Sequence, residues 1–185
     1  TKKYSALDYV GIETVTNQLD VSEMDFFHID IWSPNFTLFG IKLVDFGADG
    51  AFGGGDDVEH QVNINSPAQA TWVSLDIPLS DFVGLTTTSN IAQYILVGQP
   101  TGSTTVYVDN VFFYKEVAPV AENVNTSAAV NVGSLIVQLS EYTSDANGDA
   151  LTYNVSQPDQ GGSLTFDATT GTVNITVDND FSGLM

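Results

Sequence analysis

The clearest strand pattern in this chain is the run Phe26-Phe-His-Ile-Asp-Ile-Trp32. Apolar and polar side chains alternate along it, and a period of two residues is typical of a β-strand that buries one face. We expect the apolar set, Phe27, Ile29 and Ile31, to face a core. The outward set is then His28, Asp30 and Trp32.

Runs with the same period lie on both sides of this one. They cover residues 9–16, 39–45, 59–65, 73–79, 92–97 and 105–114. No ten-residue stretch has a helical period with capping residues, so the sequence predicts little helix beyond one turn near residues 20–25. The pattern indicates an all-β fold.

Composition and charge narrow the classes of function. The chain has 185 residues, 43% of them hydrophobic, with 4 Lys and Arg against 23 Asp and Glu, for a net charge of −19. Nucleic-acid binding needs cations that displace phosphate counterions, so we exclude it, and anionic membranes are disfavoured for the same reason. The chain contains no cysteine and no apolar run long enough to span a bilayer, so we expect no membrane insertion.

A change of composition near residues 116–119 predicts a domain boundary. All lysines precede it, whereas the rest of the chain has no basic residue and is richer in Asn, Ser and Thr. We predict a first domain at 1–115, a linker at 116–119 and a second domain at 120–185. Strands of the second domain are expected near 128–130, 135–138, 150–155 and 172–177, with turns at 145–149 and 167–171, which suits a small β-sandwich.

The loop between residues 45 and 60 combines glycines and acidic residues without any lysine or arginine. Its carboxylates belong to Asp45, Asp49, Asp56, Asp57 and Glu59. Oxygen ligands on an irregular, glycine-rich backbone suit Ca²⁺, so we predict that these residues bind at least one calcium ion. A solvated acidic loop is the alternative, because the spacing does not match an EF-hand. A strongly negative protein that binds Ca²⁺ fits an extracellular setting.

Several segments of the first domain resemble a known module. Phe27-His-Ile-Asp-Ile-Trp32, Ile41-Lys-Leu-Val-Asp-Phe-Gly-Ala-Asp-Gly50 and Gly53-Gly-Gly-Asp-Asp-Val-Glu-His60 are similar to a carbohydrate-binding module of secreted marine Bacteroidetes proteins, often found beside laminarinase-type β-glucanases. Residues 72–82 and 106–113 resemble the closing part of jelly-roll carbohydrate-binding modules.

The resemblance spans about residues 2–115 and implies a jelly-roll β-sandwich that binds polysaccharide. The module begins with an aromatic-rich strand region that has no counterpart here, so the resemblance implies an N-terminally incomplete sandwich. It also gives Asp109, between Val108 and Asn110, the place of a structural calcium ligand.

The second domain is similar to the cadherin-like repeats of large bacterial surface proteins. The matching segments are Ala118-Pro-Val-Ala121, Asp145-Ala-Asn-Gly-Asp149, Gly171-Thr-Val173 and Asp180-Phe-Ser-Gly183. The resemblance spans about residues 118–185 and implies a small Ig/cadherin-like β-sandwich that is C-terminally incomplete. We therefore expect a segment of a longer secreted or cell-surface protein, in which neighbouring domains or chains cover the incomplete sandwich edges.

A catalytic role is not expected, and we assign no catalytic residue. The laminarinase family uses a strand motif Glu-x-Asp-x-x-Glu, and His28-Ile-Asp-Ile-Trp-Ser33 keeps only the middle Asp. Retaining hydrolysis needs two carboxyl groups about 5 Å apart, which this motif does not supply. A polar sheet face explains His28 and Asp30 better than a metal or catalytic cluster.

The candidate glycan-binding residues are outward-facing. Trp32 and Trp72 fall on the polar side of alternating strands, where an indole can stack on a sugar ring. Core packing is the alternative for the other aromatic residues. We expect hydrogen bonds to the sugar from His28, Asp30 or Gln93. Few lysines stand among many acids, so an anionic polymer is repelled and the expected ligand is a neutral, laminarin-like β-glucan.

The sequence is compatible with three functions from different classes. The favoured one is non-catalytic binding of a neutral polysaccharide by part of a larger protein. The second is a calcium-dependent adhesive or structural segment of a bacterial surface protein. The third is a fragment of a glycoside hydrolase.

Overall fold

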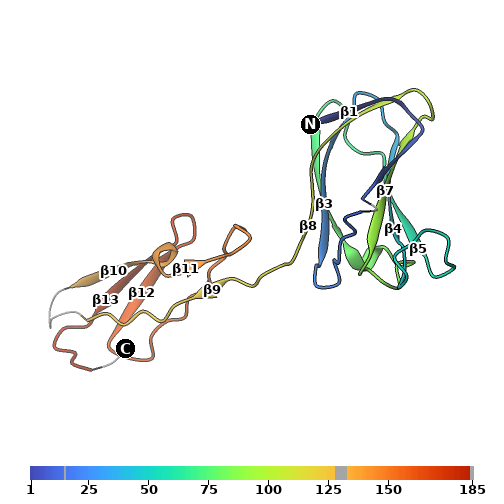
Figure 1. Cartoon of the computed structure of the whole chain (residues 1–185). Coiled ribbons are helices and arrows are strands. Elements are labelled where there is room, and N and C mark those ends of the chain that lie inside the picture. Colours follow the sequence, from blue (N-terminus) through green and yellow to red (C-terminus); the bar gives the residue numbers. More distant parts are fainter. Residues whose placement is uncertain (15, 128–132, 184–185) are drawn as a thin grey trace. The chain divides into compact units, whose positions relative to one another are not determined.

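The computed structural model describes residues 1–14, 16–127 and 133–183. Contacts divide the chain into two compact units, Thr1–Glu116 and Val117–Met185 (Figure 1). The division falls within the stretch 116–119 that we predicted as a linker. No helix in the described residues is long and apolar enough to cross a bilayer.

The first unit is a sandwich of two antiparallel sheets with four strands each. The β3 sheet has the order β1-β8-β3-β6, with the bounds Lys2–Leu7, Thr104–Tyr114, Phe26–Trp32 and Trp72–Pro78. The β4 sheet has the order β2-β7-β4-β5, with the bounds Tyr9–Glu13, Ile91–Gln99, Leu38–Asp45 and Val58–Asn65. Figure 1 shows β3 and β8 in one layer and β4, β5 and β7 in the other. This is the predicted all-β jelly-roll sandwich.

Strand alternation builds the core between the two sheets. Phe27, Ile29 and Ile31 of β3 are fully buried, as predicted. The ring centre of Phe27 lies 5.2 Å from that of Phe113 and 6.4 Å from that of Phe82. Because every second side chain points inward, the other set of each strand stands on the outer face of its sheet.

Some element boundaries differ from the prediction. Strand β1 was not predicted. Leu7 is its only buried residue, and its sequence does not alternate between apolar and polar side chains. Strand β2 ends at Glu13 rather than at residue 16. A turn is present near 20–25, and the helices of the described residues are two 3-10 turns, Leu79–Asp81 and Leu139–Glu141.

The second unit contains a three-stranded sheet, β10-β13-β12, and a two-stranded sheet, β11-β9. Their bounds are Ser134–Gln138, Thr172–Val177 and Gly162–Asp167 for the first sheet, and Thr143–Ser144 and Val120–Ala121 for the second. The strands predicted at 135–138 and 172–177 are confirmed. The strand predicted near 128–130 lies outside the described residues.

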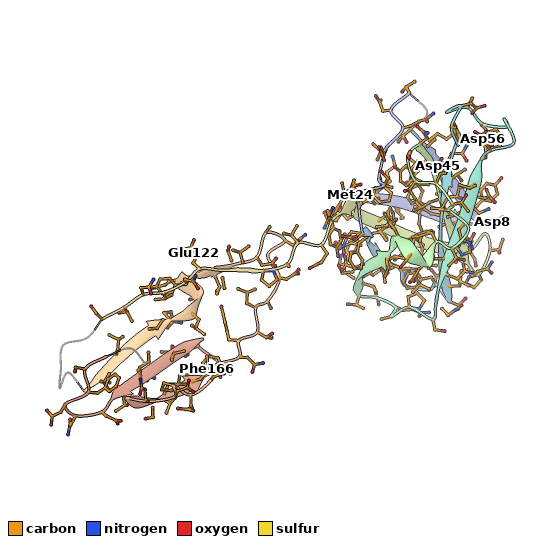
Figure 2. All side chains as sticks on the ribbon, turned by 90° about the horizontal axis from the view of Figure 1, so that it is seen from below. Asp8, Met24, Asp45, Asp56, Glu122 and Phe166 are labelled. Carbon is orange, nitrogen blue, oxygen red and sulfur yellow. The ribbon has the colours of Figure 1, made fainter. Side chains whose placement is uncertain are left out.

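The strand predicted at 150–155 is wrong, since these residues form no strand. Beside β12, the side chain of Gln157 bonds the strand edge where a further strand would pair. Gln157 Nε2 donates to the carbonyl oxygen of Leu164 at 2.8 Å, and the Leu164 N–H donates to Gln157 Oε1 at 3.0 Å. The alternation of 150–155 reflects packing instead. The ring of Tyr153 lies 6.4 Å from that of Phe166, which Figure 2 labels.

Asp145 holds the predicted turn at 145–149 together. Its Oδ1 accepts hydrogen bonds from the backbone N–H groups of Asn147 at 2.8 Å and Asp149 at 3.1 Å. An aspartate that bonds the backbone two residues later is a common turn device.

Candidate functional site

Four of the five predicted glycan-binding residues come together on the outer face of the β3 sheet. Antiparallel pairing sets Trp32 opposite Trp72 and His28 opposite Asp76. Asp30 stands between them, on the same side of β3 as His28 and Trp32. We call this surface the aromatic face. It comprises Phe26, His28, Asp30, Trp32, Trp72, Ser74, Asp76, Tyr107, Asp109, Asn110, Phe112 and Tyr114.

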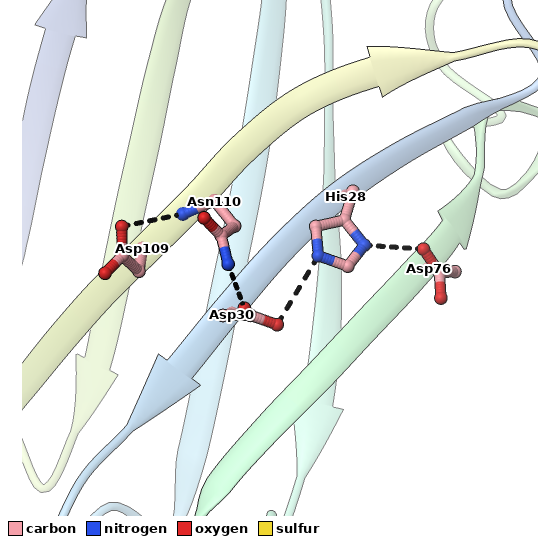
Figure 3. A network of polar contacts seen from close by, with 5 residues as sticks. All are labelled: His28, Asp30, Asp76, Asp109 and Asn110. Carbon is pink, nitrogen blue, oxygen red and sulfur yellow. Dashed lines mark hydrogen bonds and ion pairs between the residues drawn. The ribbon is translucent and has the colours of Figure 1, made fainter. Parts of the chain in front are cut away.

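A polar network crosses the middle of the aromatic face (Figure 3). His28 Nδ1 lies 2.6 Å from Asp76 Oδ1, and His28 Nε2 lies 3.4 Å from Asp30 Oδ1. Asn110 Nδ2 donates to Asp30 Oδ2 at 2.7 Å. Three strands, β6, β3 and β8, are thereby joined by side-chain contacts. Such a network holds its carboxylates in fixed positions.

A β-bulge places Asn110 in this network. The pairing of β3 with β8 shifts register between His28 and Asp30, and Asn110 has φ of 47°. Asparagine tolerates this left-handed conformation better than most residues. The extra residue reverses the alternation of β8 beyond the bulge. Phe112 and Tyr114 therefore face outward and Phe113 inward, which strict alternation from Tyr107 does not predict.

Aromatic rings lie on both sides of the polar network. At one end Trp72 is 49% exposed, and the ring of Trp32 meets that of Tyr107 edge-on at 5.3 Å. At the other end Phe112 stacks on His28 at 4.5 Å and is 47% exposed. Trp32 and His28 are four residues apart, so the strand rise separates the two ends by about 13 Å. The arrangement offers flat apolar surfaces on either side of hydrogen-bonding groups.

The pKa of Asp30 is lowered by its neighbours. Partial burial acts to raise the pKa, but hydrogen bonds from Ser74 and Asn110 and the charge of a protonated His28 outweigh it. Because the folded-state pKa lies below the unfolded one, the ionised carboxylate stabilises the fold above the unfolded value of about 3.9. That contribution is lost as the pH falls through the folded-state value.

We therefore expect the stability difference between the wild type and Asp30→Asn to narrow below about pH 4. Urea denaturation of both proteins across the acid range measures it. Above that pH the wild type should be the more stable protein, because the donors of Ser74 and Asn110 bond an ionised carboxylate more strongly than a neutral amide. A constant difference at every pH would contradict this role of Asp30.

Gln93 is not part of the aromatic face. The prediction that it binds the same sugar as Trp32 and Trp72 is therefore wrong in its placement. It lies on β7, on the outer face of the β4 sheet, where its Nε2 donates to Glu13 Oε1 at 2.9 Å. The sequence places Gln93 outward on a strand but does not say in which sheet that strand lies.

Most carboxylates of the acidic loop bond the loop itself. Asp45 is fully buried and accepts hydrogen bonds from Gly47 N at 2.8 Å, Thr87 Oγ1 at 3.1 Å and Asn90 N at 2.8 Å. Asp56 Oδ2 accepts from Ala48 N at 2.7 Å. Figure 2 shows Asp45 among packed side chains and Asp56 out in the loop. These carboxylates supply the partners that backbone N–H groups lack in an irregular loop.

The predicted metal ligands do not form one site. Among the described residues, no three His, Asp or Glu side chains gather closely enough to hold a metal ion. Glu59 pairs with Lys42 at 2.7 Å, and Asp109 belongs to the β3 sheet, whereas the loop joins β4 and β5. Asp49 Oδ1 accepts from Ala51 N, and Asp57 Oδ2 accepts from Gly53 N. In this arrangement the carboxylates bond protein groups and do not converge on one point, as the six to eight oxygens around a calcium ion would.

Ser33, which stands where the laminarinase motif has a carboxylate, has a structural use. Its Oγ accepts hydrogen bonds from the backbone N–H groups of Asn35 at 3.1 Å and Phe36 at 3.0 Å. The buried hydroxyl thus closes the turn after β3.

The comparisons with known proteins concern each unit separately. The family model described as a bacterial Ig domain matches residues 116–185. It supports an Ig-type bacterial repeat there, while the cadherin-like resemblance is a finer statement that it does not make. No curated protein matches the chain.

Carbohydrate-binding modules are among the similar solved structures. One is the family 11 module of Clostridium thermocellum in complex with a β-1,3-1,4-mixed-linked tetrasaccharide, at 17% identity and a TM-score of 0.47, covering 61% of this chain and 73% of that one. Another is a family 30 module, at 17% identity and a TM-score of 0.43, covering 62% and 60%. The class defined by the fold is an all-β chain with a jelly-roll sandwich followed by an Ig-like unit.

Proposed function

We propose that the first unit binds a neutral polysaccharide, a laminarin-like β-glucan, on the aromatic face. The observation that carries the proposal is the half-exposed Trp72 beside Trp32, on the same sheet face as Asp30 and Asp76. The apolar side of a pyranose ring stacks on an indole, and carboxylates accept hydrogen bonds from sugar hydroxyls. The ring pairs and the polar network between them suit a linear sugar chain, which has apolar ring faces and hydroxyl groups.

Charge favours a neutral ligand over an anionic one. The aromatic face carries Asp30, Asp76 and Asp109, and the lysine beside it is Lys3, whose Nζ lies 5.5 Å from the centre of the Tyr107 ring. A carboxylated or sulfated polymer would meet more negative than positive side chains. A neutral glucan meets no such repulsion.

We propose binding without hydrolysis. Asp30 and Asp76 lie on opposite sides of the His28 ring, in contact with different nitrogens. A glycosidase acid needs a raised pKa so that it carries a proton at working pH. The lowered pKa of Asp30 is the opposite of that requirement.

Titration calorimetry with laminarin and with alginate, each at low and high salt, tests the choice of ligand. We expect modest affinity for laminarin that changes little with salt, because screening has no charged pair to act on. Alginate should not bind in the absence of calcium. Alginate binding that survives removal of calcium would overturn the neutral-ligand assignment.

We also retain calcium as a proposal for the acidic loop, through Asp49, Asp56 and Asp57. Asp57 Oδ1 is buried and has no hydrogen-bond partner in the part of the chain that the structure describes, and a Cβ at Gly54 would collide with the carboxylates of Asp49 and Asp56. To coordinate the ion, these three carboxylates would have to move closer together. Calcium should then raise the melting temperature and EDTA lower it, by mass action. An unchanged melting temperature in both would refute calcium binding.

The setting we propose is a secreted or cell-surface protein of which this chain is a part. The match of residues 116–185 to a bacterial Ig domain supports a spacer or adhesive role for the second unit beside the binding unit. An adhesive segment is accordingly the second candidate function.

A further inference from the structure

The outer face of the β4 sheet carries a second group of side chains that suit a sugar chain. The alternation and register of its strands bring outward Tyr9, Gly11, Glu13, Gly40, Lys42, Val44, Glu59, Gln61, Asn63, Gln93, Ile95 and Val97. We call this surface the amide face. It is the opposite side of the sandwich from the aromatic face, because the core lies between the two sheets.

Polar groups of the amide face are neutral or paired. Gln61 Nε2 donates to Asn63 Oδ1 at 2.6 Å, and a Cβ at Gly40 would lie 2.8 Å from Gln61 Nε2. The amide of Gln61 therefore lies across the neighbouring strand, over a glycine that leaves room for it. Lys42 and Glu59 neutralise each other at 2.7 Å. Amides both donate and accept, as sugar hydroxyls do.

A buried apolar cluster lies beside these amides, and an open space lies next to it. Val44 belongs to a small buried cluster with Phe46, and Ile95 packs against that cluster. Apart from its two chain neighbours, no described residue has an atom within 4 Å of the place that a Cβ at Gly11 would take, and Gly11 is paired with Ile95. Two residues before Gly11 on β2, Tyr9 is 70% exposed. A sugar ring can occupy the space above Gly11 and contact Tyr9.

We propose that the amide face is a second polysaccharide-binding surface, so that one unit binds two neutral glycan chains and bridges them. The inference rests on the proposed function of the aromatic face and extends it. Surfaces on opposite sides of a sandwich point in opposite directions, so two separate chains can occupy them together. Linking chains in this way gives avidity on a polysaccharide matrix without any new contact.

Two variants separate the faces. Gly11→Leu fills the open space above β2, and the Gly11 backbone is outside the left-handed region, so the strand can accept the side chain. Trp72→Ala removes the exposed indole of the aromatic face. Val83→Leu is the matched control, since Val83 is 75% exposed and lies on neither face.

Calorimetry with a short laminarin oligosaccharide counts the sites. We expect two sites per chain in the wild type and in Val83→Leu, and one in Gly11→Leu. Trp72→Ala should keep one site of unchanged affinity, while its other site is weakened about tenfold. Long laminarin should raise light scattering with the wild type through cross-linking, and at equal concentration both single-face variants should raise it less.

A single site in the wild type that is unaffected by Gly11→Leu would overturn the bridging inference. Tryptophan emission then distinguishes the two failures, because both tryptophans lie on the aromatic face. A single site that changes the emission leaves the proposed function intact. A single site that leaves it unchanged contradicts both proposals.

Discussion

Asp45→Ala is expected to destabilise the first unit by about 3–5 kcal/mol, because it leaves three donors without their buried acceptor. The donors are the backbone N–H groups of Gly47 and Asn90 and the hydroxyl of Thr87. They connect the start of the acidic loop to the segment before β7, so the loss should loosen both. Urea denaturation followed by tryptophan emission reports this unit alone, since both tryptophans belong to it.

Asp49→Ala is the matched control for Asp45→Ala. Asp49 is an exposed carboxylate of the same loop, whose Oδ1 accepts from Ala51 N at 2.9 Å. We expect its loss to cost less than about 1 kcal/mol. The larger effect of Asp45→Ala should persist in EDTA, because its hydrogen-bond partners are protein groups. Equal, small effects of the two substitutions would show that Asp45 does not organise the loop.

Trp72→Ala is expected to weaken laminarin binding at the aromatic face about tenfold, which corresponds to about 1.4 kcal/mol. Stacking of flat rings on exposed aromatic side chains is worth roughly 1–3 kcal/mol in nucleic-acid sites, and a sugar ring of similar size belongs near the lower end. The emission of Trp32, which lies opposite residue 72, can follow the titration.

Val83→Ala is the control for Trp72→Ala, since Val83 is an exposed apolar residue that belongs to neither the aromatic face nor the amide face. The affinity of Val83→Ala for laminarin should equal that of the wild type. Because β6 is at the edge of the β3 sheet, Trp72→Ala should also keep the wild-type unfolding transition nearly unchanged. Full laminarin affinity in a folded Trp72→Ala protein would exclude stacking on Trp72.

Much of the fold could be predicted from alternation alone. Phe27, Ile29 and Ile31 define an inner face so clearly that β3 has the predicted bounds. Prediction from alternation failed where a segment packs its side chains but does not pair its backbone with a strand. Tyr153 packs against Phe166 without belonging to a strand, and the side chain of Gln157 bonds the open edge of β12. Neither contact leaves a local signal in the sequence.

The candidate site was predictable strand by strand but not as an assembly. Trp32 and Trp72 face outward because each alternates with apolar neighbours, and the structure then pairs them directly. Which strands share a sheet depends on contacts distant in sequence, so Gln93 was grouped with the wrong face. The contribution of Phe112 depends on the bulge at Asn110, which reverses the alternation within β8.

In the acidic loop, composition alone does not distinguish a metal site from a loop held by its own hydrogen bonds. Dense carboxylates beside glycines predict oxygen ligands, yet Asp45, Asp56 and Asp57 also satisfy backbone N–H groups of a loop without ladder partners. Both uses need the same residue types. Only the positions of the donors distinguish them, and these follow from the folded loop rather than from residue spacing.

The most direct test of the central claim is a laminarin titration of the intact chain followed by tryptophan emission, with calorimetry on the same samples. Both tryptophans, Trp32 and Trp72, lie side by side on the aromatic face, so the emission reports that surface alone. The account predicts a saturable emission change with laminarin and none with alginate. Laminarin binding by calorimetry with unchanged tryptophan emission would contradict it.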